Sequence, residues 1–195
     1  LTATLYNNTG SVYYSQGNYV DALENYEKTL AIEEKVLGEN HPDTATSYYN
    51  IGGVCYSQGD YAEALKYHQK ALAIREKVLG ENHPDTATSY NNIGGVYYSQ
   101  SDYAEALKYY EKALAIEEKV LGENHPDTAT LYYNIGFVYY SQGDYAEALN
   151  YYEKALAIYE KVLGEEHPYT QIVTRNIEAI RQLMQSQVSK RVKRG

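Results

Sequence analysis

The stretch GENHPDTAT occurs three times in the chain, at residues 38–46, 80–88 and 122–130, and an altered copy, GEEHPYTQ, begins at Gly164. Each copy places a glycine where a helix can end and a His-Pro step a few residues later. A residue before proline disfavours helical geometry, whereas proline and then aspartate suit the first turn of a new helix. The stretch therefore predicts a joint between two helices and not a catalytic triplet.

The joint recurs with a fixed period, because its histidines are spaced by 42 residues. The 42-residue blocks that begin at Asp43 and Asp85 differ at only six positions. A period this regular is typical of a stacked array of one supersecondary unit. The four histidines are His41, His83, His125 and His167, and the six differences are Tyr49/Asn91, Cys55/Tyr97, Gly59/Ser101, His68/Tyr110, Gln69/Glu111 and Arg75/Glu117.

Each block is predicted to form two amphipathic helices. In the third block, apolar residues recur at helical spacing from Tyr90 to Tyr97 and again from Ala106 to Val120, with a turn around Ser101 between them. The charged residues of the second segment lie off this stripe and are interpreted as a solvated face. The predicted pairs are 2–16 with 19–37, 43–58 with 61–79, 85–100 with 103–121, and 127–142 with 145–163, and a ninth helix begins near Tyr169.

The segment YNNIGGVYYSQSDYAEALKYYEKAL, from Tyr90 to Leu114, resembles the tetratricopeptide repeat. The resemblance recurs in every block and is least complete in the first, where Thr9 and Thr29 depart from the pattern. The long unit that ends in EKVLGENHPDTA is similar to the repeats of kinesin light chains and of the sensors on some signalling NTPases. HEAT and armadillo arrays have similar periods, but the Gly-Tyr-Ala spacing favours the tetratricopeptide repeat. The matching positions are Tyr90, Ile93, Gly94, Tyr97, Ala106, Tyr110 and Ala113.

We therefore predict an all-α fold, a right-handed superhelical solenoid of antiparallel helix pairs. Four tandem repeats occupy residues 1–168, a capping helix occupies 169–188, and a basic flexible tail occupies 189–195. A cap is expected because the last pair of an open array otherwise exposes an apolar side.

The resemblance implies that the first helix of each pair lines a concave groove where peptides bind. The residues carried over to this groove are Tyr, Asn, Ser, Thr and Gly, with no charge, which suits hydrogen bonds and flat aromatic contacts. Phe137 is the only Phe and is interpreted as an apolar anchor, the alternative being a chance substitution on a tolerant surface. The predicted groove comprises Asn7, Ser11 and Tyr14; Tyr49, Gly53 and Tyr56; Asn91, Gly95 and Tyr98; and Tyr133, Phe137 and Tyr140, flanked by Thr4, Thr46, Thr88 and Thr130 and by Ser15, Ser57, Ser99 and Ser141.

The composition of the chain limits the classes of partner that it can be expected to bind. The net charge of −9 and the pI of about 5.0 disfavour nucleic acid. No apolar run is long enough for a membrane span. The single cysteine, Cys55, precludes an internal disulfide and predicts a reducing, cytoplasmic location. Because the predicted groove lacks Lys and Arg, we expect neither a carboxylate clamp nor acidic cargo peptides, and we predict a neutral or basic protein or peptide partner.

No enzyme activity, metal or cofactor is predicted. Histidines on successive repeats lie about a helix diameter apart and cannot converge on one zinc ion. His68 and Cys55 stand where other blocks carry Tyr, so both are interpreted as packing residues. The leading hypothesis is a binding scaffold. The alternative is a structural spacer, a self-associating element whose terminal repeats stack, or the sensor arm of a larger signalling protein.

Overall fold

A computed structural model describes residues 2–192 of the chain, and within this range it contains nine helices and no strand. The first eight helices begin and end within one residue of the predicted positions. The ninth continues to Val192, past the predicted end at 188, and residues 193–195 of the predicted tail lie outside the described part. The helices are α1 (Thr2–Ser15), α2 (Tyr19–Val36), α3 (Pro42–Gln58), α4 (Tyr61–Val78), α5 (Pro84–Ser99), α6 (Tyr103–Val120), α7 (Pro126–Gln142), α8 (Tyr145–Leu163) and α9 (Pro168–Val192).

The repeated stretch is a joint, as predicted. His41 is the N-cap of α3, with extended backbone angles (φ −83°, ψ 145°), and its Nδ1 accepts a hydrogen bond from the Asp43 amide at 3.1 Å. Pro42 follows in the first turn of the helix. The Thr44 hydroxyl donates to the carbonyl of Gly38 at 2.9 Å, which ties the loop to the new helix. The same bonds recur at the joints before α5 and α7, so the histidine ring is used for capping.

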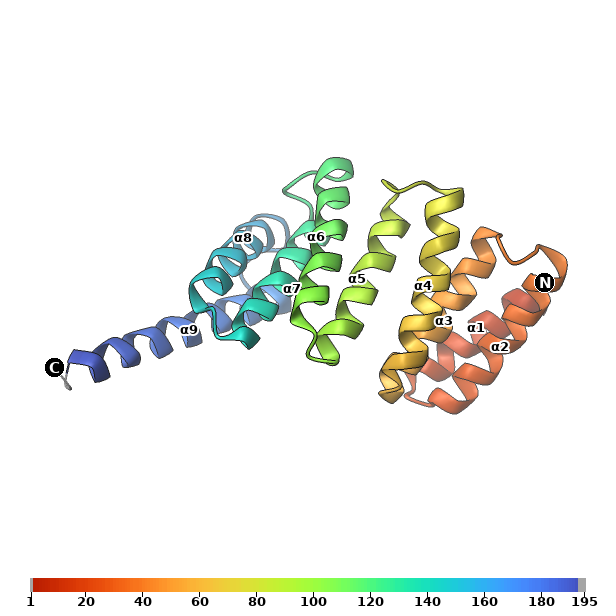
Figure 1. Ribbon diagram of the computed structural model, residues 1–195, viewed down its shortest axis with the longest axis horizontal. Helices are drawn as coiled ribbons and strands as arrows, with labels where there is room; N and C mark the ends of the chain where they lie inside the picture. Colours follow the sequence, from red (N-terminus) through yellow and green to blue (C-terminus); the bar gives the residue numbers. More distant parts are fainter. Residues whose placement is uncertain (1, 193–195) are drawn as a thin grey trace. The chain divides into compact units, whose positions relative to one another are not determined.

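The chain divides into two compact units, Leu1–Tyr109 and Tyr110–Gly195, which we describe separately. In the first unit each helix from α1 to α4 packs against the next one along the chain, the last contact being that of α4 with α5 (Figure 1). In the second unit α7 packs against α8, and α8 packs against α9. Consecutive helix pairs therefore stack in chain order within each unit, which is the solenoid arrangement. The right-handed sense of the predicted superhelix stays a prediction.

The two helices of a pair approach closely at one glycine of the first helix. A Cβ atom added at Gly10 would lie 2.9 Å from the Tyr26 ring, and one added at Gly136 would lie 2.8 Å from the Tyr152 ring. In the second repeat the same position, Gly52, faces His68. The bulky ring of the second helix thus occupies the space that a side chain on the first helix would need, which explains a mid-helix glycine that costs about 0.5–1 kcal/mol.

Successive pairs are tied by a buried tyrosine that reaches the preceding second helix. The Tyr48 hydroxyl donates to Glu34 at 2.5 Å, and the Tyr132 hydroxyl donates to Glu118 at 2.6 Å. Burial, together with the adjacent carboxylate, raises the pKa of both phenols well above their ordinary value. These phenols therefore stay protonated and remain donors at physiological pH.

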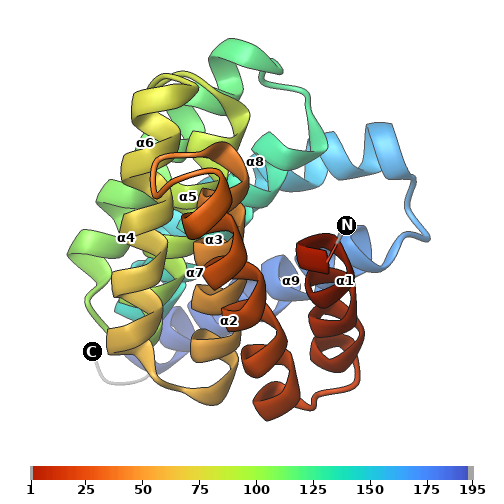
Figure 2. The same ribbon diagram turned by 90° about the vertical axis from the view of Figure 1, so that its right-hand side faces the viewer.

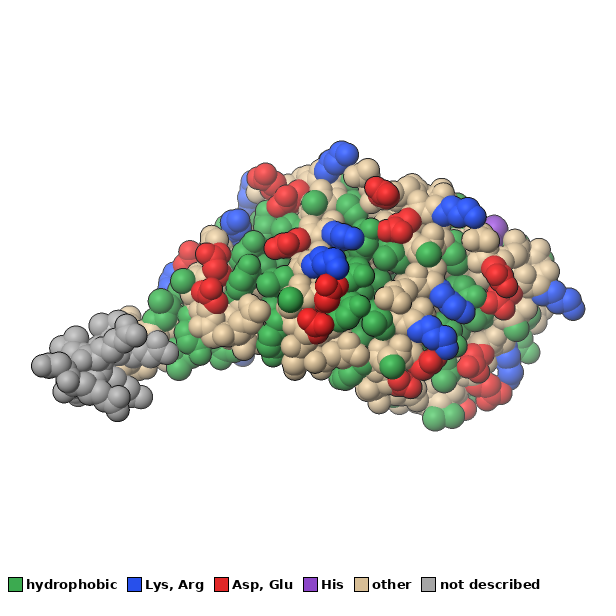
Figure 3. Space-filling model, in the orientation of Figure 1, with side chains coloured by type: hydrophobic (Ala, Val, Ile, Leu, Met, Phe, Trp, Pro, Cys, Tyr) green, Lys and Arg blue, Asp and Glu red, His purple; other side chains and the backbone are tan. Residues whose placement is uncertain are grey.

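The second helices carry the charged residues on an exposed face. Figure 3 shows acidic and basic side chains interspersed over α4 and α6. Lys66 pairs with Glu63 and Lys108 pairs with Glu105, both at 2.9 Å and three residues apart. Exposed pairs at this spacing contribute little to stability, so this face is explained by solvation.

Candidate functional site

In the first unit, hydrogen bonds between first helices place the residues of the predicted groove side by side. The Asn50 amide donates to Asn7 Oδ1 at 2.9 Å, which joins α3 to α1. The Tyr14 hydroxyl lies 2.9 Å from Ser57 Oγ, and the Tyr56 hydroxyl lies 2.9 Å from Ser99 Oγ. Since none of the predicted groove residues is buried, α1, α3 and α5 form one continuous polar surface.

The tyrosines at the C-terminal end of this surface are held on two sides. The ring of Tyr14 packs against Tyr19 at 5.7 Å between centroids, and that of Tyr56 packs against Tyr61 at 5.6 Å. The hydroxyls of Tyr14 and Tyr56 are engaged by the serine contacts described above. Both rings are nevertheless exposed. Fixed, exposed aromatic faces bind a partner at a lower entropic cost than mobile ones.

In the second unit, α7 carries a row of three aromatic rings at i, i+4 and i+7. The rings of Tyr133 and Phe137 lie 6.1 Å apart at an interplanar angle of 8°, and those of Phe137 and Tyr140 lie 6.4 Å apart at 5°. Phe137 and Tyr140 are exposed, and Tyr133 is half-buried. We call these three residues the aromatic row. Phe137 fills the gap between two tyrosines, whereas the equivalent Gly53 leaves open space.

A pocket of about 220 Å³ adjoins the start of the aromatic row, between α7 and α9. The Tyr159 hydroxyl lies 2.9 Å from Thr130 Oγ1 at this pocket, and the Tyr159 ring packs against Tyr169 at 5.9 Å between centroids. The pocket is mostly apolar, so it suits an aliphatic or aromatic side chain. Its walls are Thr130, Tyr133, Asn134, Tyr159, Tyr169, Ile172 and Val173.

A set of residues that the sequence analysis did not assign to a site lies beneath the predicted groove. They come from the last turns of the second helices, at one position of the repeat. Glu33 accepts a hydrogen bond from Ser47 at 2.6 Å, and Arg75 donates to Ser89 at 2.9 Å, each across to the next first helix. We call this position the floor position; its occupants are Glu33, Arg75, Glu117 and Tyr159.

The floor position is occupied by Glu in the first and third repeats, by Arg in the second and by Tyr in the fourth, and the two glutamates differ in their hydrogen bonds. Glu117 is buried, and its Oε2 has no hydrogen-bond partner in the described structure, because Leu131 stands where Ser47 and Ser89 occur. Burial, with a further contribution from Asp127, raises the pKa of the Glu117 carboxyl. The sequence held a signal for this position: Arg75/Glu117 is a change of charge sign between two nearly identical blocks.

Cys55 and His68, which the sequence analysis interpreted as packing residues, are buried inside the packed pairs. Burial raises the pKa of the Cys55 thiol to about 11, and burial with nearby Arg75 lowers the pKa of His68 to about 4. At neutral pH the thiol is therefore protonated and the imidazole is neutral. Within the described residues, no group of three His, Cys, Asp or Glu side chains could hold a metal ion. None of the described helices combines the length and the apolar character needed to cross a membrane.

These features define stacked helix pairs that carry a polar surface on α1, α3 and α5 in the first unit and the aromatic row on α7 in the second. The sequence pattern of the tetratricopeptide repeat matches residues 1–77, 48–119, 85–161 and 127–187. The matches together span nearly the whole chain, which therefore belongs to the tetratricopeptide repeat family. A search of curated proteins finds no match.

Solved structures share this fold. A putative kinesin light chain from Podosopora anserina with nearly identical repeats has a TM-score of 0.80 at 24% identity, covering 100% of this chain and 93% of its own. BtubC (BKLC) from P. vanneervenii has a TM-score of 0.79 at 24% identity, with coverages of 89% and 69%. The apo form of RapI has a TM-score of 0.81 at 20% identity, with coverages of 95% and 65%.

Proposed function

We propose that the chain is a non-catalytic scaffold that binds an extended peptide or a partner helix on the predicted groove. Proteins of this family generally serve protein–protein interactions. The observation that carries the proposal is the aromatic row of Tyr133, Phe137 and Tyr140 beside the pocket that contains Tyr159 and Tyr169. Exposed rings in a fixed row, next to a hollow that accepts one side chain, have the features of an interaction hot spot.

The test uses substitutions that the chain already contains at equivalent positions. Phe137→Gly copies Gly53, and Tyr133→Asn copies Asn91. A library of amidated peptides about nine residues long, which span about 30 Å when extended, serves as the probe. We expect peptides selected by the unaltered chain to bind the double variant at least ~10-fold more weakly, as loss of an aromatic hot spot of about 1.4 kcal/mol or more implies.

The matched control is Val162→Ser, which removes an exposed apolar residue of α8 outside the predicted groove. It should leave the affinity unchanged. Equal affinity of the unaltered chain and the double variant, with unchanged helicity, would refute the groove as the binding surface.

Self-association is a second candidate function, favoured by one observation at the start of the chain. Leu5 and Val12 of α1 are exposed, although the later repeats bury the equivalent residues. A second copy that covers this face would form a dimer, and the measurement that tests it is given in the Discussion. The predicted cytoplasmic location, and a role as spacer or sensor arm of a larger protein, stay predictions.

A further inference from the structure

The pocket beside the aromatic row is walled by three tyrosines from three helices. Tyr133 comes from α7, Tyr159 from α8 and Tyr169 from α9. The other walls are two polar and two aliphatic side chains, and none of the seven described residues around the pocket carries a charge. The pocket therefore offers a bound group aromatic rings and methyl groups, but no carboxylate and no cation.

Each of the three rings is held in place by a neighbour. The Tyr133 ring packs against Tyr152 at 5.4 Å between centroids. The Tyr169 ring packs against Tyr159 at 5.9 Å and against His167 at 5.3 Å. Burial raises the pKa of the Tyr159 phenol, so this wall stays uncharged at physiological pH. Rings that are already fixed bind a ligand at a lower entropic cost than mobile ones.

The equivalent positions of the other repeats carry charged or polar side chains. Ile172 stands where the first helices of the second, third and fourth repeats carry threonine. Tyr159 occupies the floor position, which is charged in the first three repeats, and Tyr169 replaces the aspartate that follows His-Pro at the other joints. The replaced residues are Thr46, Thr88 and Thr130; Glu33, Arg75 and Glu117; and Asp43, Asp85 and Asp127.

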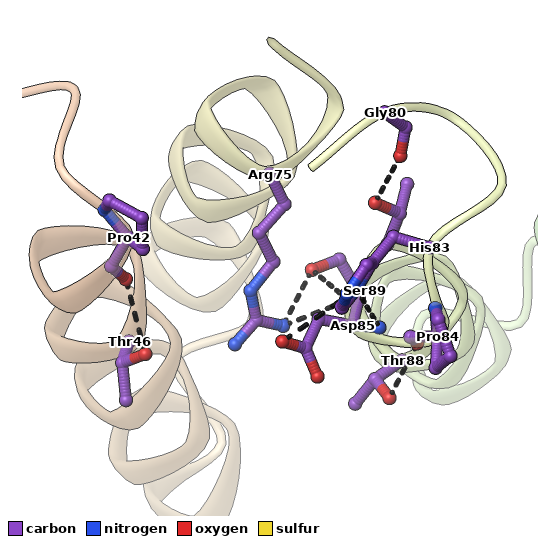
Figure 4. A network of polar contacts seen from close by, with 10 residues as sticks. Pro42, Thr46, Arg75, Gly80, His83, Pro84, Asp85, Thr88 and Ser89 are labelled. Carbon is purple, nitrogen blue, oxygen red and sulfur yellow. Dashed lines mark hydrogen bonds and ion pairs between the residues drawn. The ribbon is translucent and has the colours of Figure 1, made fainter. Parts of the chain in front are cut away.

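Figure 4 shows how the second repeat fills the same space with a polar network. The Arg75 guanidinium donates to the carbonyl of Asp85 at 3.0 Å and to Ser89 Oγ at 2.9 Å. In the fourth repeat Val173 stands in the place of Ser89, and the floor residue is Tyr159. The space between α7 and α9 has thus exchanged a polar network for an aromatic pocket.

Packing of α9 against the array does not explain all of these changes. Val173 is 1% exposed and is accounted for by packing. Tyr169 is 57% exposed and Ile172 is 37% exposed, although both border the same pocket. Neighbouring apolar side chains that stay exposed around a hollow indicate a binding site, whereas isolated ones need no explanation.

We propose that this pocket binds a quaternary ammonium group. Such a cation is attracted to tyrosine rings when it lies within about 6 Å of their centroids. It has no N–H group, so it needs none of the acceptors that a buried lysine or arginine has to find. Its methyl groups are suited to contact with Ile172 and Val173, and the chain's net charge of −9 attracts cations at long range.

This inference goes beyond the proposed scaffold function, because the group can occupy the pocket with or without a bound peptide. Two sources present the same chemistry, a small quaternary amine such as choline and the side chain of a trimethylated lysine in a partner protein. The experiments test the site first and its source afterwards.

The first experiment compares choline with its uncharged analogue, in which carbon replaces the nitrogen. NMR signals of the Ile172 methyl groups, assigned by their loss in Ile172→Val, are followed at constant ionic strength. We expect choline to shift these signals saturably and the analogue to bind at least ~5-fold more weakly, as loss of a cation–π contact implies. Equal binding of both compounds would reveal a plain apolar pocket and overturn the site, and so would the absence of saturation with choline.

A matched pair of variants tests the aromatic wall. Tyr169 is exposed, so Tyr169→Leu and Tyr169→Phe should both keep the circular dichroism of the unaltered chain. We expect Tyr169→Leu to bind choline ~5-fold more weakly and Tyr169→Phe to bind it like the unaltered chain, because phenylalanine keeps the ring. Unchanged binding by Tyr169→Leu, or equal weakening in both variants, would contradict recognition by the ring.

The last experiment identifies the source with two basic peptides that differ only in trimethylation of one central lysine. We expect the trimethylated peptide to bind more tightly, since an unmodified ammonium is strongly hydrated and finds no carboxylate in the pocket. Tighter binding than choline identifies a protein partner, and equal binding identifies a small amine; preference for the unmodified peptide overturns the site. Choline binding in a chain that captures no peptide refutes the groove function alone, whereas peptide capture without choline binding refutes the ammonium site alone.

Discussion

Two adjacent glycines of α3, Gly52 and Gly53, have opposite surroundings. A Cβ atom at Gly52 would lie 2.7 Å from His68 Nδ1, whereas one at Gly53 would meet nothing within 4 Å. We expect Gly53→Ala to raise the free energy of unfolding by about 0.5–1 kcal/mol, since alanine is the better helix former. We expect Gly52→Ala to lower the free energy of unfolding by about 1–2 kcal/mol, since the cost of overpacking against His68 exceeds the gain in helix propensity.

Urea denaturation of the two variants measures both values, and each variant is the control for the other. Both variants replace glycine by alanine in the same helix. A difference between their unfolding free energies therefore reports the surroundings of the two positions alone. Two stabilising effects of similar size would mean that His68 moves aside at no cost and that the close approach is not a packing constraint.

His68 should make stability depend on pH. Its pKa is lowered from 6.5 to about 4, first by burial and then by Arg75, so the folded state holds the neutral ring. Between these two values the unfolded state binds the proton and the folded state does not, so stability falls as the pH drops from 6.5 towards 4. Between pH 7.5 and pH 5 the loss from this residue is about 2 kcal/mol.

The control for this titration is His68→Tyr, which installs the residue found at Tyr26, Tyr110 and Tyr152. Because all other titrating groups are shared, the difference in unfolding free energy between the two proteins isolates His68. That difference should shift by about 2 kcal/mol in favour of the variant from pH 7.5 to pH 5. A constant difference would show that the imidazole titrates normally in the folded chain.

At the scale of the element, the end of α5 departs from those of the other first helices. Ser101 has φ +63°, and among the described residues other than glycine it alone has a positive φ. The equivalents Gly17, Gly59 and Gly143 have φ values of +74°, +82° and +81°. The left-handed conformation favours glycine, so we expect Ser101→Gly to raise the free energy of unfolding by about 0.5–1 kcal/mol.

Thermal and urea denaturation check this expectation, and Gly59→Ser is the reciprocal variant. Gly59→Ser should lower the free energy of unfolding by about as much as Ser101→Gly raises it. If both changes were neutral, the turn would not be strained by a side chain at this position.

The boundaries of the helices could be predicted from the sequence because each one is marked by local chemistry. Proline and a capping histidine start α3, α5 and α7, and a left-handed glycine follows α2 and α4. For α9 the sequence shows no such marker near the predicted end at 188, and the structure describes the helix as far as Val192. The helix ends that could be predicted are therefore those that turn and capping residues set.

The residues carried over from the family resemblance do lie on unburied faces of the first helices, because helical periodicity keeps them on one face, and their role in binding stays a prediction. The contacts made at the floor position could not be predicted from the sequence. Periodicity indicates that residue 75 faces inward, but it does not tell which neighbouring helix the long side chain reaches. That outcome depends on the distance between α3 and α5 and on Ser89, which only the packed structure supplies.

At the scale of the whole molecule, the terminal helices differ in the chemistry that they expose. In α9, Glu178 and Arg181 are exposed at the positions where α7 packs Gly136 and half-buried Tyr139 against α8. A polar outer face of this kind is what a capping helix needs, and the capping role of α9 stays a prediction. Figure 2 views the chain from the side of α1 and α2, where Leu5 is exposed instead. Apolar contact between copies therefore favours α1 of one chain against α1 of the other.

The face of α1 leads to the prediction that the chain forms a weak dimer. Val12 is 55% exposed, although the equivalent Val54 and Val96 are 0% exposed, and Leu5 is 65% exposed. Burying these side chains in both copies contributes about 1.5–3 kcal/mol each, against an association cost of about 4–15 kcal/mol. We therefore expect a dissociation constant on the order of 10–1000 μM, measured by sedimentation equilibrium over that concentration range.

The charged variant Leu5→Lys/Val12→Lys should remain monomeric throughout this range, because dimerisation would bury four ammonium groups. The matched control is Val20→Lys, which also adds a lysine to the first repeat. Val20 is 71% exposed, and its equivalents Ala62 and Ala104 are exposed too, so no repeat uses this position for stacking. The control should dimerise like the unaltered chain. A monomeric unaltered chain, or equal weakening by Val20→Lys, would exclude α1 as the dimer interface, and the scaffold would then present its groove as a single copy.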